Sequence, residues 1–219
     1  MHYNTGMPVA HPQTSSPFAW LPWLLSASVS GLAVYVWGSS VDWRLGGLSV
    51  YELFPLLGLL AWSIMWSQYV TGLLRRFWLP DSDLRNYYSW TGYFVLFAIL
   101  MHPGLLAYQR LRDGFGLPPR SETSYVAPSL SWVVVLGMVS LLVFLAFELH
   151  RWFQDRRWWR YVGTLVDLAM LAIFYHALRL GTQTHIGWFR WVWWFYGLVL
   201  VIVLLEKYLG RLFIRRSPA

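Results

Sequence analysis

The chain has 219 residues, of which 57% are hydrophobic and 12% are charged, and it contains no cysteine. Several apolar runs are long enough to cross a hydrocarbon core of about 30 Å, which excludes a soluble domain and indicates a polytopic membrane protein. The net charge of +7 does not indicate nucleic-acid binding, because the basic residues fall at segment ends, where anionic lipid headgroups account for them. The absence of cysteine excludes disulfides, thiolate haem ligands and cysteine-bound iron–sulfur clusters.

Six hydrophobic segments follow a polar N-terminal stretch. Residues 1–17 are rich in Pro, Ser and Thr and lack the basic start of a signal peptide, so they predict a disordered tail. Because the connections are short, we expect one all-α bundle of six transmembrane helices over 18–209, followed by a basic tail over 210–219. The helices are expected near 18–38, 49–72, 87–108, 128–149, 161–181 and 189–209.

The distribution of basic residues predicts the orientation of the bundle. Eleven of the 17 Lys and Arg residues fall on the side of the N-terminus, with the strongest clusters after the second and fourth segments, and six fall on the other side. Both termini are therefore expected in the cytoplasm, and the third and fifth helices are expected to run outward.

Two histidines occupy matching positions in the third and fifth segments. His102 and His176 each lie about fifteen residues into their helix, or roughly 22 Å along it at 1.5 Å per residue. An ionisable ring in apolar sequence usually has a function. Two imidazoles that face each other inside a helical bundle can hold a b-type haem by both axial positions, which is the interpretation we favour. Histidines that only hydrogen-bond across helices are the alternative.

Two arginines near these histidines are candidates for binding haem propionates. Arg179 lies three residues beyond His176, on the same helix face and nearer the outer surface. Arg110 could act in the same way from the third helix. Either arginine could instead be an ordinary positive charge at a helix end.

Asp167 lies in an otherwise apolar run, where a carboxylate suggests proton handling or a cofactor hydrogen bond. A structural hydrogen bond to Ser63, Gln68 or Thr91 explains it equally well. Together with His102 and His176, Asp167 also supports a second class of function, a proton or small-solute transport protein that uses these residues as a relay. A cofactor-free subunit of a larger membrane complex is a third.

The six-helix organisation resembles the ferric-reductase-like transmembrane domain superfamily, which includes NADPH oxidases, STEAP metalloreductases and the haem-binding subunit of a bacterial methionine sulfoxide reductase. The segments that carry the resemblance are YYSWTGYFVLFAILMHPGLL and WWRYVGTLVDLAMLAIFYHAL. It covers nearly the whole chain and implies haem ligation by His102 and His176. Two-haem members have a second, inner pair of histidines, where this chain has Tyr88 or Ser89 and Gly163. The resemblance therefore implies a single-haem variant.

The resemblance also implies partners and a location. Single-haem relatives place a flavin in the inner layer, and Gly163 with Trp158, Trp159, Arg157 and Arg160 would suit such a ligand, although the same residues would make an interfacial belt. No Gly-rich nucleotide fingerprint is present, so the electron donor would be another protein, a quinol or a reduced flavin. Electrons would pass toward an extracytoplasmic acceptor, which could be ferric iron, oxygen or a partner protein. The expected location is the inner (plasma) membrane of a bacterium.

Overall fold

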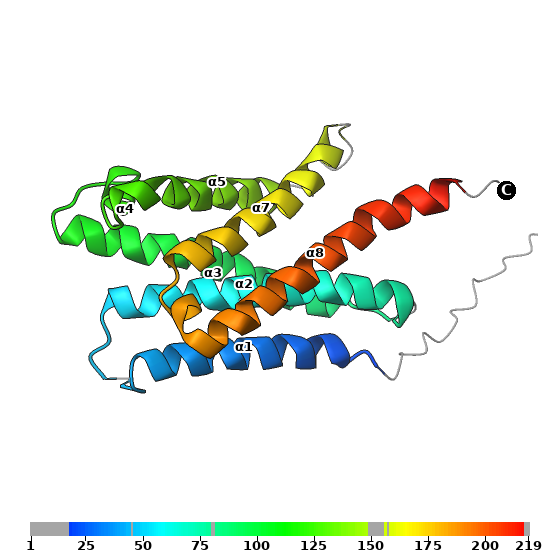
Figure 1. The fold of residues 1–219 in the computed structure, drawn as a ribbon, viewed down its shortest axis with the longest axis horizontal. Helices are drawn as coiled ribbons and strands as arrows, with labels where there is room; N and C mark the ends of the chain where they lie inside the picture. Colours follow the sequence, from blue (N-terminus) through cyan, green and yellow to red (C-terminus); the bar gives the residue numbers. More distant parts are fainter. Residues whose placement is uncertain (1–17, 45, 80–81, 149–155, 157, 217–219) are drawn as a thin grey trace, which may run out of the picture.

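All regular structure in the described residues of the computed structural model is helical (Figure 1). The structure describes residues 18–44, 46–79, 82–148, 156 and 158–216. Two short 3₁₀ turns, η1 and η2, directly precede α5 and α8. The elements in chain order are α1 (Leu21–Ser40), α2 (Val50–Phe77), α3 (Arg85–Arg112), α4 (Arg120–Thr123), η1 (Pro128–Leu130), α5 (Ser131–Glu148), α7 (Trp159–Leu180), η2 (Gln183–His185) and α8 (Gly187–Arg216).

Six of these helices are long and apolar enough to cross a membrane, namely α1, α2, α3, α5, α7 and α8. The predicted all-α bundle of six transmembrane helices is therefore confirmed. Large apolar side chains cover its outside, as expected for a surface that contacts lipid; Phe97, Leu142 and Leu198 are among the most exposed. Several boundaries differ from the predicted ones by a few residues, and α8 continues to Arg216, into the stretch 210–219 that is expected to form a tail. Leu, Arg and Phe favour continuation of a helix in that stretch more than they favour a break.

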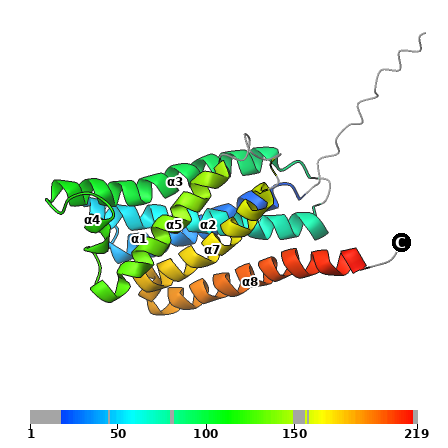
Figure 2. The same cartoon turned by 90° about the horizontal axis from the view of Figure 1, so that it is seen from above.

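Two antiparallel helix pairs form the body of the bundle. The first pair is α2 with α3, which α1 covers, and the second is α5 with α7. Helix α8 packs against both α2 and α7 and so joins the two pairs. Figure 1 shows α5 and α7 on one side of the molecule and α1 and α2 on the other, and in Figure 2 α3 and α8 lie at opposite edges.

An aromatic cluster fixes the position of α8 between the pairs. The ring centroids of Trp62 on α2 and Trp193 on α8 are 4.3 Å apart, and Phe174 on α7 stacks parallel to Trp193 at 6.2 Å. One turn further along α2, the indole N–H of Trp66 donates to the carbonyl oxygen of Tyr196 at 2.8 Å. Buried aromatic rings contribute a large apolar area at low side-chain entropy, so this cluster is a strong tie between helix pairs.

The two ends of the described chain lie at the same end of the bundle (Figure 1). The start of α1 and the end of α8 both lie there, as do Arg75 and Arg76 at the end of α2 and Arg85 at the start of α3. We call this the inner end, following the charge distribution, and the opposite end the outer end.

The orientation can be tested with single cysteines, because the chain has no native cysteine that would react. Asn86 is exposed near the inner end and Ser129 is exposed in η1 at the outer end. We expect a membrane-impermeant maleimide added outside sealed cells to label Ser129→Cys, and to label Asn86→Cys only after the membrane is permeabilised. The opposite labelling pattern would reverse the orientation.

Candidate functional site

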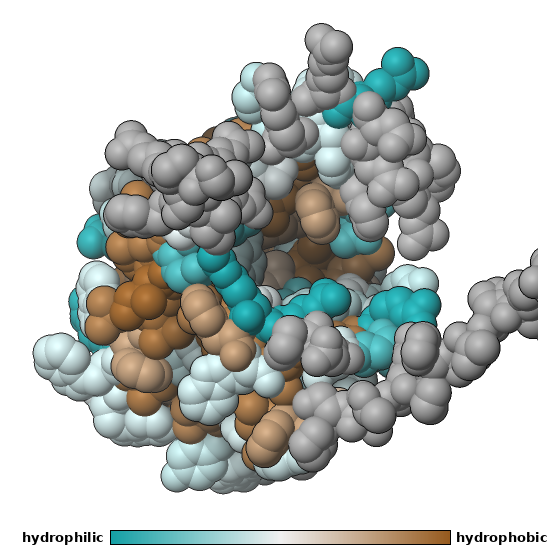
Figure 3. All heavy atoms as spheres, turned by 90° about the vertical axis from the view of Figure 1, so that its right-hand side faces the viewer, coloured by the Kyte–Doolittle hydropathy of each residue, from teal (hydrophilic) through white to brown (hydrophobic). Residues whose placement is uncertain are grey.

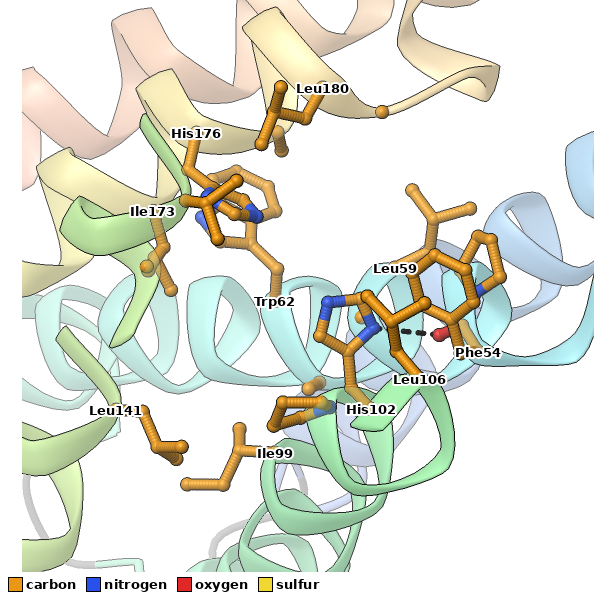
Figure 4. Close-up of a pocket in the computed structure, with 18 of the residues that line it drawn as sticks. Phe54, Leu59, Trp62, Ile99, His102, Leu106, Leu141, Ile173, His176 and Leu180 are labelled. Atoms are coloured by element: carbon orange, nitrogen blue, oxygen red, sulfur yellow. Dashed lines mark hydrogen bonds between the residues drawn. The ribbon is translucent and has the colours of Figure 1, made fainter. Parts of the chain in front are cut away.

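A cavity of about 260 Å³ lies between the two helix pairs, toward the outer end. Its wall is mainly apolar, with Leu59, Leu106, Leu141 and Ile173 among the residues that line it. Figure 4 shows the ring of His102, from α3, and the ring of His176, from α7, on opposite sides of this space. The structure therefore brings together the two histidines that the sequence singled out.

The ring of His102 is held by two features of the neighbouring helix α2. Its Nδ1 lies 2.7 Å from the carbonyl oxygen of Phe54. One turn further along, the ring lies directly against Gly58, where an added Cβ would come within 2.8 Å of both Nδ1 and Cε1 of His102. Only glycine leaves room for the imidazole at this position without a shift of the ring or of α2.

His176 is held in the same way by α5. Its Nδ1 lies 2.9 Å from the carbonyl oxygen of Val133, and its ring lies against Gly137, where a Cβ would come within 2.7 Å of Nδ1 and Cε1. In both cases the carbonyl precedes the glycine by four residues. We call this carbonyl-and-glycine arrangement the histidine clamp; each helix pair carries one.

The clamps determine which nitrogen of each ring is available to a ligand. A carbonyl oxygen can only accept a hydrogen bond, so Nδ1 must carry the hydrogen in both rings. In a neutral imidazole with this tautomer the lone pair is on Nε2, which is a common ligand atom for metals. A hydrogen bond from Nδ1 to a backbone carbonyl also orients the ring and raises the basicity of Nε2.

Three polar atoms on residues that line the same cavity have no hydrogen-bond partner. They are Nε1 of Trp62, Nε1 of Trp193 and Oε1 of Gln183. Each of these atoms has almost no accessible surface, so none of them faces the open space of the cavity. The other end of the Gln183 amide donates to the hydroxyl of Ser40 at 3.1 Å.

The two candidate arginines lie at different places relative to the cavity. Arg110 is only 6% exposed; its Nε donates to the carbonyl of Ser121 at 3.1 Å, and its guanidinium lies over the ring of Phe115 at 3.4 Å from the centroid. Arg110 therefore fastens the connection between α3 and α5 over the outer end. Arg179 is exposed and is not among the described residues that line the cavity. A propionate contact by either arginine stays a prediction.

Tyr125 lies in the same connection and lines the mouth of the cavity. Its ring stacks on Tyr51 of α2 at a centroid distance of 5.6 Å and meets Phe54 edge-on at 6.1 Å. Burial raises the pKa of the Tyr125 phenol, against an opposing effect of the Arg110 charge. The phenol is therefore neutral at physiological pH, and aromatic rings cover the His102 side of the cavity.

A second cavity, of about 490 Å³, lies toward the inner end. Its wall includes Gly72, Gly92 and Gly163, one each from α2, α3 and α7, and open space lies where each would carry a Cβ. Figure 3, which views this end, shows a recess with apolar side chains at depth and hydrophilic ones beside it. The residues that line both cavities, and so separate them, are the apolar Met65, Ile99 and Phe144.

The inner cavity includes part of the predicted inner-layer site. Gly163 lines it, whereas Trp158 is exposed and neither Trp158 nor Trp159 is among its described lining residues. Arg157 lies outside the described residues, as does the side chain of Arg160.

Asp167, at the wall of the inner cavity, is 3% exposed and has three hydrogen-bond donors around it. Lys207 Nζ lies 2.5 Å from its Oδ2, the hydroxyl of Tyr208 donates to the same oxygen at 2.5 Å, and the hydroxyl of Tyr69 donates to Oδ1 at 2.8 Å. The expected partners Ser63, Gln68 and Thr91 are thus replaced by residues of α2 and α8. Because apolar side chains separate this pair from the histidines, the geometry favours a structural role over a relay.

The remaining histidines form no second site among the described residues. His185 in η2 is exposed, and His2, His11 and His150 lie outside the described residues. Among the described residues, no group of three or more His, Cys, Asp or Glu side chains could hold a metal ion. A haem held by two histidines would need only the two ligands at the outer cavity.

The fold and the cavities define an integral, multi-pass α-helical membrane protein with two buried histidines at a shared cavity. Comparisons with protein-family models, with curated proteins and with solved structures found no match.

Removal of the Lys207 charge is expected to destabilise the protein, because Asp167 would then be buried without its cation. We expect Lys207→Met to lower the free energy of unfolding by about 2 kcal/mol, less than for a wholly buried pair because Lys207 is partly exposed. Thermal unfolding in detergent measures this change. A value for Lys207→Met equal to wild type would show that the pair contributes nothing.

The exposed ion pair between Asp83 and Arg85 provides a matched control. Hydrogen bonds from Arg85 hold the pKa of the Asp83 carboxyl at about 2, so this pair is fully ionised at neutral pH. Both side chains are well exposed, so Arg85→Met should change the unfolding temperature little.

Proposed function

We propose that this protein transfers electrons across the membrane through one b-type haem ligated by His102 and His176 in the outer half of the bundle. The observation that supports the proposal is the pair of histidine clamps, which leave Nε2 as the free ring nitrogen of both imidazoles at one cavity. The arrangement occurs on both sides of one open space, where the two free Nε2 atoms could share a ligand.

The residues present fit a haem in two respects. The donor set is two imidazoles on facing helices, and the walls between them are mainly apolar. A haem with two histidine ligands supplies one-electron transfer and has no open position at which oxygen could bind iron. The clamps would hold both rings in place before the ligand enters.

The protein itself would orient the two imidazole rings and exclude water from the haem site. The hydrogen bonds from Nδ1 to Phe54 and Val133 fix both ring planes, and the apolar wall keeps water from the site. The aromatic cover formed by Tyr51 and Tyr125 closes the side nearest the outer end. Electrons would leave through that cover toward an extracytoplasmic acceptor, such as ferric iron, oxygen or a partner protein.

The inner cavity is the proposed place for the electron donor. Its three glycines leave space for a flat molecule, and Arg76 and Lys207 at its wall are each paired with a carboxylate, Glu206 and Asp167. A flavin or a quinol has suitable dimensions and chemistry, in line with the resemblance to the ferric-reductase-like superfamily. Among the described residues, Met65, Ile99 and Phe144 line both cavities and would lie between such a donor and the haem cavity. We place the protein in the inner membrane of a bacterium on the same resemblance.

The visible spectrum of the purified protein tests the proposal directly. We expect a Soret band in the wild type that is lost in His102→Ala and in His176→Ala, because either change removes an axial ligand. His185→Ala, which alters an exposed histidine outside the cavity, should keep the band. A folded wild-type protein that stays colourless after growth with added haem precursor would contradict the proposal and favour a cofactor-free subunit.

The glycines of the clamps provide a more selective test than the ligands. Gly58→Ala and Gly137→Ala would each place a Cβ within 2.8 Å of an imidazole, so the ring would have to move away from its position in the clamp. We expect part of the oxidised protein to change from low spin to high spin, seen by electron paramagnetic resonance, with a several-fold loss of bound haem. Gly104→Ala, two residues from His102 with open space around its Cβ, is the control. Unchanged spectra in both clamp variants would show that the glycines do not position the ligands.

A further inference from the structure

The two helix pairs that enclose the outer cavity are joined on one side only. Helix α8 packs against both α2 and α7, whereas α3 and α5 are not among the helix pairs that pack together in the described part of the chain. Figure 2 shows α3 and α5 diverging toward the outer end, where the short helix α4 contacts both of them. The two helices are therefore linked at the outer end and stand apart below it.

Four apolar residues border the space between α3 and α5. Each of them lines the outer cavity and is partly exposed, and they are Ile99 and Pro103 on α3 and Met138 and Leu141 on α5. Figure 4 shows Ile99 and Leu141 on facing sides of the cavity. On the α8 side, by contrast, the lining residues Trp62 and Trp193 are buried. We call the four residues the lateral portal.

The other routes into the cavity are blocked by side chains of the described residues. At the outer end, the stacked rings of Tyr51 and Tyr125 lie across it, beneath the connection that Arg110 fastens. Toward the inner end, the apolar residues that line both cavities separate it from the second one. The lateral portal is the remaining route, and it faces the hydrocarbon core because α3 and α5 are both long and apolar enough to cross the membrane.

We infer that the outer cavity opens to the bilayer through the lateral portal and that its ligand enters from the lipid rather than from water. The identity of that ligand, a tetrapyrrole, rests on the proposed function. A largely apolar macrocycle is more soluble in hydrocarbon than in water, so the bilayer is where it gathers. The portal residues are all apolar and place no charge on its path.

A border made of two helices suits an opening toward lipid. Nearly all polar backbone groups of a helix are bonded within it, so α3 and α5 can face hydrocarbon at little cost. Pro103 has no N–H to donate to the carbonyl of Ile99, which makes α3 easier to bend at the portal. Separation of α3 from α5 would break no packed helix pair, whereas separation at α8 would break the contact of Trp62 with Trp193.

The first test does not depend on haem. The full-length protein without haem is placed in vesicles whose phospholipid carries a photoreactive diazirine on its acyl chain, and the labelled residues are located by mass spectrometry. We expect label on Met138 and Leu141, in the portal, as well as on Leu142, which is exposed on the outside of α5. Label on Leu142 with none on Met138 and Leu141 would overturn the portal.

The second test narrows the portal. Met138→Trp places a large side chain at its α5 edge, and Val139→Trp, at the neighbouring exposed position, is the matched control. With haem b supplied from the vesicle lipid, we expect Met138→Trp to slow both the uptake of haem and its loss to a haem-scavenging protein several-fold. Both rates fall because a barrier on the path acts in both directions. Val139→Trp should exchange haem at the wild-type rate.

The outcomes separate the portal from the proposed function. Uptake by Met138→Trp at the wild-type rate would overturn the portal, because haem would then use another route. Slower uptake with faster loss would also overturn it, because the substitution would then have weakened the binding site instead of the path. A wild type that takes up no haem, but is labelled at Met138 by the lipid, would overturn the proposed function and leave the portal in place.

Discussion

The structure depends on one constraint: a polar ring inside a membrane protein must have a hydrogen-bond partner, and lipid cannot supply one. His102 and His176 meet this constraint with a backbone carbonyl on the partner helix, at 2.7 Å and 2.9 Å. A ring from another helix can reach a carbonyl inside a helix only where no side chain stands beside that carbonyl. Gly58 and Gly137 provide such positions. The same contacts that satisfy one nitrogen leave the other free.

The rest of the bundle keeps the two helix pairs at a distance that leaves room between them. Trp62, Phe174 and Trp193 fill one side with aromatic rings, and Arg110 ties the connection between α3 and α5 across the outer end. Toward the inner end, Lys207 and Asp167 join α8 to α7 across the wall of the second cavity. On these sides the open spaces are therefore bounded by strong contacts rather than by loosely packed helices.

Much of this arrangement could be predicted from the sequence, because hydropathy over twenty residues determines spans and constant helical rise determines depth. For this reason the six helices and the equal depth of His102 and His176 could be predicted from the sequence. The positions of the glycines opposite these histidines could not be predicted. Contacts between helices depend on the rotation of each helix about its axis, and the spacing of residues alone does not determine that rotation. Nothing in the spacing of the 17 glycines distinguishes Gly58 and Gly137 from the others, because the partner on each helix is a backbone carbonyl that every residue has. The partner of Asp167 could not be predicted, because a lysine near the end of the last hydrophobic segment is equally typical of the membrane surface.

The thin apolar wall formed by Met65, Ile99 and Phe144 has an electrical consequence. Such a wall blocks water and ions, while an electron can tunnel across a few side chains. For the proposed transfer, negative charge would thus move outward without an accompanying proton. A cell interior that is negative favours that direction by about 2.3 kcal/mol per 100 mV for a charge that crosses the whole field, and by a fraction of this across the wall. The resting voltage of the membrane would then assist turnover, and its collapse would slow it.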